Sequence, residues 1–152
     1  MERSVTDKAH DLAQSMLDET DGDVNNLPEV LQTVILVFIG QGVIDNGGLE
    51  YFYENDFPGQ PSYDVIVAAF RRIGAEAVAD CIERTADMFT FPNPHKKREE
   101  RNDWMGSIED AEGHEFHQLS NYACGHESVW PLLDAYVFKY RAFLEDLPTE
   151  AD

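Results

Sequence analysis

Lysine and arginine are absent from the long segment between Ala9 and Phe70, which carries eleven Asp and Glu residues. Charges of one sign cannot pair with one another, so the surface that this segment builds projects a negative field. The excess holds for the whole chain, which has 30 acidic residues against 11 basic ones and a formal net charge of -19. Binding to nucleic-acid phosphates requires clusters of basic side chains. The composition therefore argues against direct nucleic-acid binding and favours a positively charged partner.

Cysteine is scarce, and neither a long apolar run nor a secretory leader is seen. Cys81 and Cys124 lie in unrelated contexts without CxxC spacing, which favours free thiols in a reducing cytoplasm. The longest apolar run, Val34 to Ile39, is far too short to span a bilayer. The charged start, MERSVTDKAH, has no apolar core before a cleavage site. We therefore expect a cytoplasmic protein without membrane association.

The chain is nevertheless rich enough in apolar residues to fold. Its 152 residues suit one domain with its own core, and 43% of them are hydrophobic and 11% aromatic. Disordered acidic segments are poor in aromatic residues, so this class is excluded. The acidic residues are expected to cover the surface of a folded body.

Apolar residues recur at helical spacing along nearly the whole chain. Thr6 is the expected N-cap of a first helix, and Pro28 and Glu29 open a second one that is apolar on most sides and forms the central core helix. The segment Asp45 to Gly48 breaks this helix and precedes an aromatic turn over residues 51–53.

The second half of the chain shows the same periodicity. Ser62 caps a helix that stops at Gly74, and the next helix runs from Ala75 to about Phe89. A short helix follows around residues 116–122, and Ser128 caps a last helix whose apolar face continues to residue 144. No segment alternates apolar and polar residues at period two. The sequence thus predicts an all-α fold, a single compact multi-helix domain over residues 1–152.

One predicted helix carries a row of carboxylates. Its four acidic residues are spaced four, three and four apart, which places them on one helical face, opposite an apolar face: Glu76, Asp80, Glu83 and Asp87. At a rise of ~1.5 Å per residue this row is about 16 Å long, and phosphates along a DNA strand advance ~3.4 Å per base pair. A second row is predicted on the first helix: Asp7, Asp11 and Asp18.

The row has a plainer interpretation beside the functional one. Acidic stripes on surface helices are usually solvated faces. Like charges at a spacing of four cost a few tenths of a kcal/mol per pair, which a purely structural face has no need to bear. That small cost favours a partner-binding surface without excluding a solvated one.

Four basic residues of the segment 95–104 alternate with Glu99 and Glu100: Lys96, Lys97, Arg98 and Arg101. Their charges nearly cancel, which predicts a salt-bridged surface helix and no nucleic-acid patch.

Metal and catalytic signatures are incomplete. His114 and His117 are three residues apart, whereas the HExxH zinc motif places its histidines four apart. With Cys124 and His126 they lack an evident fourth ligand. The chain also lacks a GxSxG nucleophile, a P-loop lysine and an EF-hand. We expect no cofactor, no metal and no enzymatic activity; an enzyme or metal protein using these four residues is the least favoured alternative.

The segment from Asn46 to Asn55, NGGLEYFYEN, resembles the signature of a bacterial helical domain family of unknown general function: NGG, an apolar residue, paired aromatics and a closing Asn. The glycines allow a tight turn between helices, and Asn46 and Asn55 can bond to backbone groups around it. The resemblance extends over about residues 28–146, and the family often has Gln at the position of Tyr51. Its best-known member is an acidic, all-helical DNA mimic that binds a helix-turn-helix repressor.

These observations favour a non-enzymatic acidic protein that occupies the DNA-binding surface of a transcription factor or another basic DNA-binding protein. The acidic rows are the residues expected to bind it, and a homodimer is left open. The alternative is adaptation to a high-salt cytoplasm, in which dense carboxylates keep a protein soluble and its function is unrelated to its charge. Steep salt dependence of binding is expected of the first and instability in dilute buffer of the second.

Overall fold

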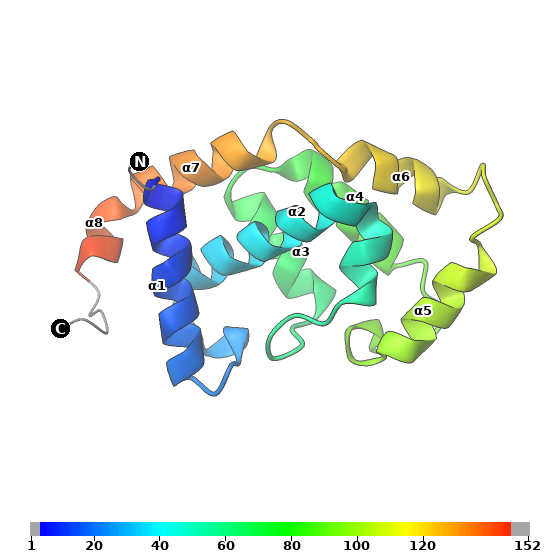
Figure 1. Cartoon of the computed structure of the whole chain (residues 1–152), viewed down its shortest axis with the longest axis horizontal. Helices are drawn as coiled ribbons and strands as arrows, with labels where there is room; N and C mark the ends of the chain where they lie inside the picture. The colour runs from blue at the N-terminus through cyan, green and yellow to red at the C-terminus, as the bar shows by residue number, and fades with distance from the viewer. Residues whose placement is uncertain (1–3, 147–152) are drawn as a thin grey trace.

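The computed structural model describes residues 4–146. In this range the chain forms eight α-helices and two short 3-10 turns, at Val24–Asn26 and Pro94–Lys96, and no strand. The helices are α1 (Val5–Glu19), α2 (Glu29–Glu54), α3 (Tyr63–Arg72), α4 (Glu76–Ala86), α5 (Arg98–Ser107), α6 (Glu115–Ala123), α7 (Val129–Lys139) and α8 (Arg141–Glu145). They pack into one body (Figure 1), which confirms the predicted all-α fold.

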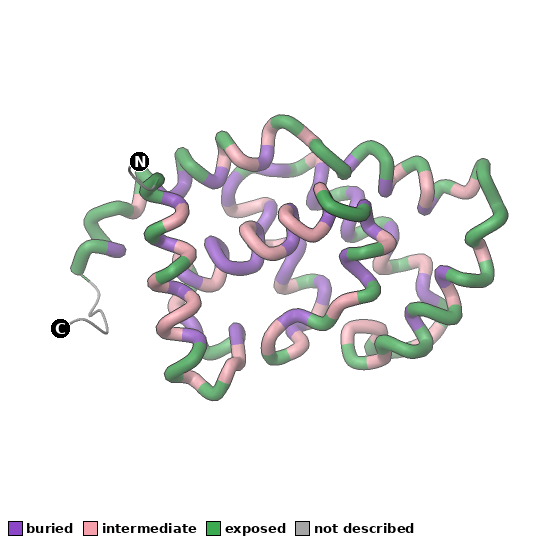
Figure 2. The backbone as a smooth tube through the Cα atoms, in the orientation of Figure 1, coloured by how far each residue is buried: buried purple, intermediate pink, exposed green. Residues whose placement is uncertain are grey.

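Helix α2 lies at the centre of the fold. It contacts α1, α3, α5, α6 and α7. Figure 2 shows buried residues along its length, while exposed positions gather on the outer helices and loops. Among the described helices, α2 is also long and apolar enough to span a membrane by length and composition. The core helix of a soluble protein meets the same test, and packing against five helices accounts for the apolar composition of α2.

A kink interrupts α2 at the two glycines of the NGG segment. Gly47 has φ −157° and ψ 16°, and Gly48 has φ 72° and ψ −169°, so neither is helical. The helix then resumes and continues to Glu54. The predicted break is confirmed, but the aromatic segment 51–53 is helical and not a turn. Within it Phe52 and Tyr53 are buried and Tyr51 is exposed.

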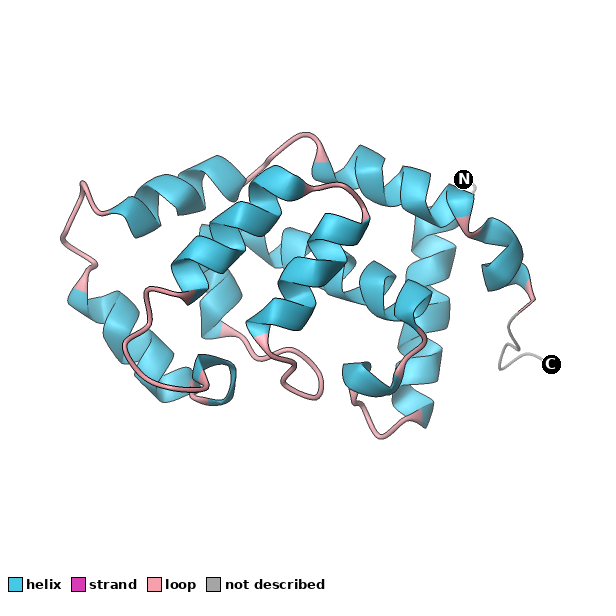
Figure 3. Ribbon diagram, turned by 180° about the vertical axis from the view of Figure 1, so that it is seen from behind, coloured by secondary structure: helices cyan, strands magenta, loops and turns pink. Residues whose placement is uncertain are grey.

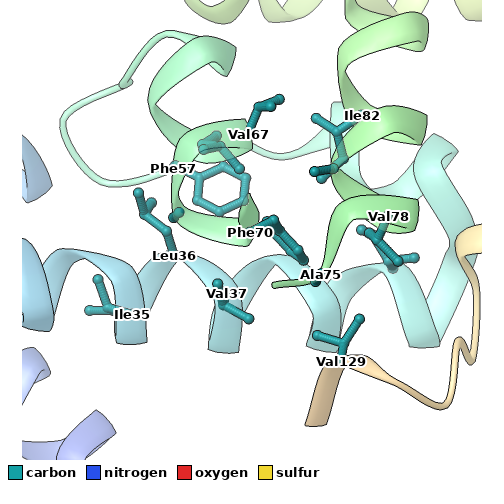
Figure 4. Packing of buried hydrophobic residues seen from close by; sticks show 14 of the residues in the cluster. Ile35, Leu36, Val37, Phe57, Val67, Phe70, Ala75, Val78, Ile82 and Val129 are labelled. Carbon is teal, nitrogen blue, oxygen red and sulfur yellow. The ribbon is translucent and has the colours of Figure 1, made fainter. Parts of the chain in front are cut away.

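Helices α3 and α4 form a hairpin that covers one side of α2. Gly74 turns the chain with φ 89°, and the backbone N–H of Ala75 donates to the Phe70 carbonyl at 2.9 Å. The Phe70 ring packs closely on α2: a Cβ at Gly40 would lie 3.3 Å from it. Figure 4 shows the side chains of α3 and α4 over the apolar side of α2, and Figure 3 shows the molecule from behind.

The predicted cap of the first helix is wrong. The N-cap is Ser4, whose hydroxyl accepts a hydrogen bond from the Asp7 backbone at 3.0 Å. Thr6 lies inside α1, is buried, and donates its hydroxyl proton to Asp134 of α7. The position that resembled a cap is thus a packing contact between the first and the seventh helix.

The last helix is shorter than predicted. Helix α7 ends at Lys139, and Leu144 belongs to the separate helix α8. Ser128 precedes α7 without a side-chain capping bond, and Ser62 likewise precedes α3 without one. The short helix predicted around residues 116–122 is confirmed as α6.

The prediction of a self-neutral charged helix is wrong for one of its residues. Arg101 is fully buried, and its Nε donates to the Tyr53 carbonyl at 2.8 Å. Its Nη2 pairs with Asp56 at 2.7 Å. Arg101 therefore joins α5 to the end of α2 and does not pair with Glu99 or Glu100 on its own helix.

Candidate acidic binding surface

Helix α4 presents the four predicted carboxylates to solvent. Its opposite face is buried against the core, with Val78, Cys81, Ile82 and Thr85 all inaccessible or nearly so. The helix ends at Ala86 and does not continue to Phe89 as predicted. The side chains of Glu76, Asp80 and Glu83 are 62%, 60% and 52% exposed. Asp87, at the C-cap of α4, is also exposed. The row lies on one face as the spacing predicted.

A single arginine from the preceding helix contacts most of this row. Arg71 of α3 forms ion pairs with Glu76, with Asp80 at 3.0 Å and with Glu83 at 3.4 Å. Hydrogen bonds to Asp80 and then Glu76 raise the pKa of Arg71 above its ordinary value. The row is therefore less negative than four carboxylates alone, and its spacing is held by a central guanidinium.

The charge pattern gave no indication of this contact, because Arg71 lies one residue beyond the base-free segment. The sequence does contain a feature that indicates the contact: Arg71 precedes Glu76 by five residues, with Gly74 between them. A glycine stop between two helices indicates a hairpin, which brings the end of the first helix beside the start of the second.

Asp87 forms no ion pair within the described range, so it is the unneutralised end of the row.

The second acidic row lies on another part of the surface. Helix α1 packs on α2 and α7, whereas α4 packs on α3 and α6. In Figure 1, α1 crosses the end of the molecule that also holds α8. Asp7 is half-buried, Asp11 lies within 3.9 Å of His10, and Asp18 accepts a hydrogen bond from Gln14 at 3.3 Å. The structure does not bring the two rows into one patch.

The histidines and the second cysteine occupy separate local positions. The His114 ring caps α6 by accepting from the Phe116 backbone at 3.0 Å, and the His126 ring contacts the Ser128 hydroxyl at 2.8 Å. Cys124 is exposed, and its thiol lies 3.7 Å from the Asp45 carbonyl. Cys81 is a buried free thiol. Among residues 4–146, no group of three or more His, Cys, Asp or Glu side chains is arranged to hold a metal ion.

His117 instead belongs to a network around the α2 kink. The Ser120 hydroxyl accepts from the Leu49 backbone at 2.8 Å and donates to Glu50 at 2.5 Å. The other Glu50 oxygen lies 3.2 Å from His117 Nδ1, and His117 Nε2 lies 2.8 Å from the Ile108 carbonyl. The hydrogen bond to the Ile108 carbonyl raises the pKa of His117, and Glu50 raises it further. Burial acts in the opposite direction, but the pKa stays above its ordinary value. This network joins α6 to the kink, and no sequence motif indicated it.

The closing asparagine of the NGG segment also has a structural role. Asn55 donates its side-chain amide to the Tyr51 carbonyl at 2.8 Å, as expected for a residue that bonds to the backbone near a helix end.

Comparison with known proteins gives one finding. The family model described as DMP19-like protein matches residues 25–140, which is more than half of the chain. The matched range contains the whole α4 row and Arg71, whereas Asp7, Asp11 and Asp18 precede it. No curated protein and no solved structure gives a significant match.

Proposed function

Because this chain belongs to the DMP19-like family, we propose that it is an acidic, non-enzymatic binding protein that mimics DNA toward a basic DNA-binding protein. DMP19 itself is a DNA mimic. The observation that carries the proposal for this chain is the exposed carboxylate row on α4, which lies inside the matched range. The partner is a protein, such as a transcription factor, whose nucleic-acid surface is rich in Lys and Arg.

The geometry of the row supports this role. Successive residues of the row have Cβ atoms about 5–6 Å apart, and the row extends about 16 Å along α4. A basic surface that binds duplex DNA carries Lys and Arg placed to contact successive phosphates. Such side chains can contact the α4 carboxylates in the same way, with Asp87 as the end that no base among residues 4–146 neutralises.

The contacts of Arg71 favour fixed side-chain positions for the carboxylates of the α4 row. It contacts three carboxylates from different turns of α4 and restrains their side chains. Surface carboxylates without a partner sample several rotamers, and fixing them on binding costs entropy. We infer that the arginine lowers this cost for the partner's cations while leaving the surface negative.

The experiment that tests the proposal is affinity capture from a lysate of the source cell, with elution by a KCl gradient and identification by mass spectrometry. We expect a DNA-binding protein that is released by salt and displaced by its own DNA site. The double variant Asp80→Lys with Glu83→Lys is expected to lose this protein, because it reverses the centre of the row.

A matched control separates the row from net charge. Glu99 and Glu100 are exposed in the first turn of α5 and do not belong to the α4 row. The variant Glu99→Lys with Glu100→Lys changes the net charge by the same amount and is expected to retain the partner. Equal loss in both variants would show that only overall charge matters, and retention in the α4 variant would show that the row is a solvated face.

A further inference from the structure

A groove lies beside the kinked end of α2, away from the α4 row. Its volume is about 510 Å³, and it is bordered by the C-terminal half of α2 and by α5, with His117 of α6 contributing to its lining. Volumes of roughly 300–1,000 Å³ are typical of small-molecule sites. No residue of the α4 row or of Arg71 lines it. The groove is therefore separate from the surface that is proposed to mimic DNA.

The charges around the groove favour a cation. Three carboxylates line it, Glu50, Glu54 and Glu109, against the cationic Arg98 and the titratable His117. Glu50 already contacts Ser120 and His117. In the part of the chain that the structure describes, Glu54, Glu109 and Arg98 form no ion pair. Among residues 4–146, Glu54 and Glu109 thus form no direct ion pair, although Arg98 lines the same groove.

The groove also offers surfaces suited to an alkyl chain and to a planar cationic group. Tyr51 is 42% exposed and lines the groove, and a cation over a tyrosine face gains about 0.5–1 kcal/mol at an exposed site. Met105 contributes a nearly buried apolar side chain, against which a methylene chain can pack. The Asn102 amide, also in the lining, supplies a further hydrogen-bonding group.

One lining residue of the groove is a glycine. Gly106 lines it from α5, and a Cβ at this position would meet no atom within 4 Å. A larger residue at this position would therefore project into open space without a clash. This makes Gly106 a position at which the groove can be filled while the helix is preserved.

We propose that this groove binds an alkylguanidinium or alkylammonium group, such as the head and stem of an arginine side chain. The cationic head contacts Glu54 and Glu109 and lies on the Tyr51 ring, while the stem packs on Met105. Two sources share this chemistry: a free small amine or guanidine, and a basic side chain of another protein.

The test is a titration of the full-length, isotope-labelled chain followed by amide chemical shifts. The probes are butylguanidine, its neutral isostere butylurea, and the peptide acetyl-Gly-Arg-Gly-amide, all at constant ionic strength. We expect saturable shifts at Tyr51, Asn102 and Glu109 with butylguanidine and none with butylurea. Comparable binding of the peptide assigns the site to protein side chains, whereas binding of butylguanidine alone assigns it to a small molecule.

Three variants decide whether the groove is the site. Glu54→Gln with Glu109→Gln is expected to weaken binding about tenfold or more, since hydrogen bonds to charged groups contribute about 1.5–3 kcal/mol each. Gly106→Leu is expected to abolish binding by filling the groove. Gly42→Leu is the matched control, because a Cβ at Gly42 also meets no atom and lies elsewhere on α2. Equal affinity for butylurea, or full binding by Gly106→Leu, would overturn the proposal.

Discussion

Arg101 and Asp56 form an ion pair at the end of α2, with 2.7 Å between Nη2 and Oδ1. The arginine is fully buried and the Asp56 side chain is 32% exposed. The same guanidinium donates to the carbonyls of Tyr53 at 2.8 Å and Pro94 at 2.6 Å. The last carbonyls of a helix lack partners within it, and a cation is favourable there. Arg101 thus donates hydrogen bonds at the C-terminal end of α2 and links α5 to it.

Replacement of Arg101 by Met is expected to lower the free energy of unfolding by about 3–5 kcal/mol, the usual loss when one partner of a buried ion pair is removed. Met fills a similar volume but leaves the Tyr53 and Pro94 carbonyls without a donor. Urea denaturation followed by circular dichroism measures the change.

Arg98 on the same helix provides the control. It is exposed and forms no ion pair among residues 4–146, so Arg98→Met is expected to change the unfolding free energy by less than about 0.5 kcal/mol. Arg101→Lys is expected to be intermediate, because an ammonium cannot reproduce the planar fork of donors. Equal stabilities of the two Met variants would contradict the role assigned to Arg101.

Gly48 and Gly42 are expected to respond to alanine with opposite signs. Gly48 has φ 72°, and a Cβ there would lie 2.4 Å from the Ser120 hydroxyl oxygen. We expect Gly48→Ala to cost at least about 1–2 kcal/mol, because φ 72° with ψ −169° lies in a region of backbone conformation essentially limited to glycine. Gly42→Ala, at an open helical position, is expected to gain about 0.5–1 kcal/mol. Melting temperatures of both variants test this, and a stabilised Gly48→Ala would show that the kink is not fixed.

The interactions of His117 predict a dependence of stability on pH. Both ring nitrogens face oxygen atoms, of Glu50 and of the Ile108 carbonyl, and only the protonated ring can donate to both. The pKa of His117 is therefore raised in the folded protein from its ordinary value of 6.5. This stabilisation is fully present below the ordinary pKa and is lost as the pH rises through the folded pKa.

Comparison with His117→Gln isolates this contribution from the overall charge. We expect wild type to exceed the variant in unfolding free energy by more at about pH 5.5 than at about pH 9, because only the wild-type side chain titrates. Glu50→Gln is expected to lower the pKa of His117, as read from the imidazole resonances. A pH-independent difference between wild type and His117→Gln would contradict the prediction.

The fold class could be predicted from the sequence because helical periodicity is local. Pro28 and Gly74 mark the expected helix boundaries, and Gly47 with Gly48 marks the expected break inside α2. The assignment of Thr6 failed because Thr is suited both to a cap and to a buried contact, and only the position of Asp134 in space distinguishes them. Information of that kind is not contained in spacing along the chain.

Part of the candidate surface could also be predicted, because the spacing of residues along one helix is local. The alignment of Glu76, Asp80, Glu83 and Asp87 follows from helix geometry alone. The contact of Arg71 with three of them depends on how α3 and α4 pack, and the burial of Arg101 depends on where α2 ends. Charged residues are usually exposed, so a pattern of alternating signs gives no indication that one of them lies in the core.

Arg71→Gln is expected to destabilise the protein slightly and in a salt-dependent way. Its three partners are exposed, so we expect a loss of about 1 kcal/mol or less in dilute buffer, and less still in 1 M KCl, where the screening length is ~3 Å. Arg84→Gln, which breaks a single exposed pair with Glu115, is the control and is expected to cost less. Denaturation at two salt concentrations measures both, and an equal loss at low and high salt would indicate a packing role for Arg71.

A melting curve against KCl distinguishes a DNA mimic from a salt-adapted protein. With a net charge of -19, the folded chain repels itself, and KCl is expected to raise the melting temperature by weakening that repulsion. If the acidity serves recognition, the core around α2, Arg101 and the Arg71 pairs must hold the fold without added salt. We therefore expect a cooperative transition in about 20 mM buffer and a rise of only a few degrees up to 1 M KCl. Loss of the folded state in dilute buffer would assign the charge to adaptation, and the α4 row would then need no partner to explain it.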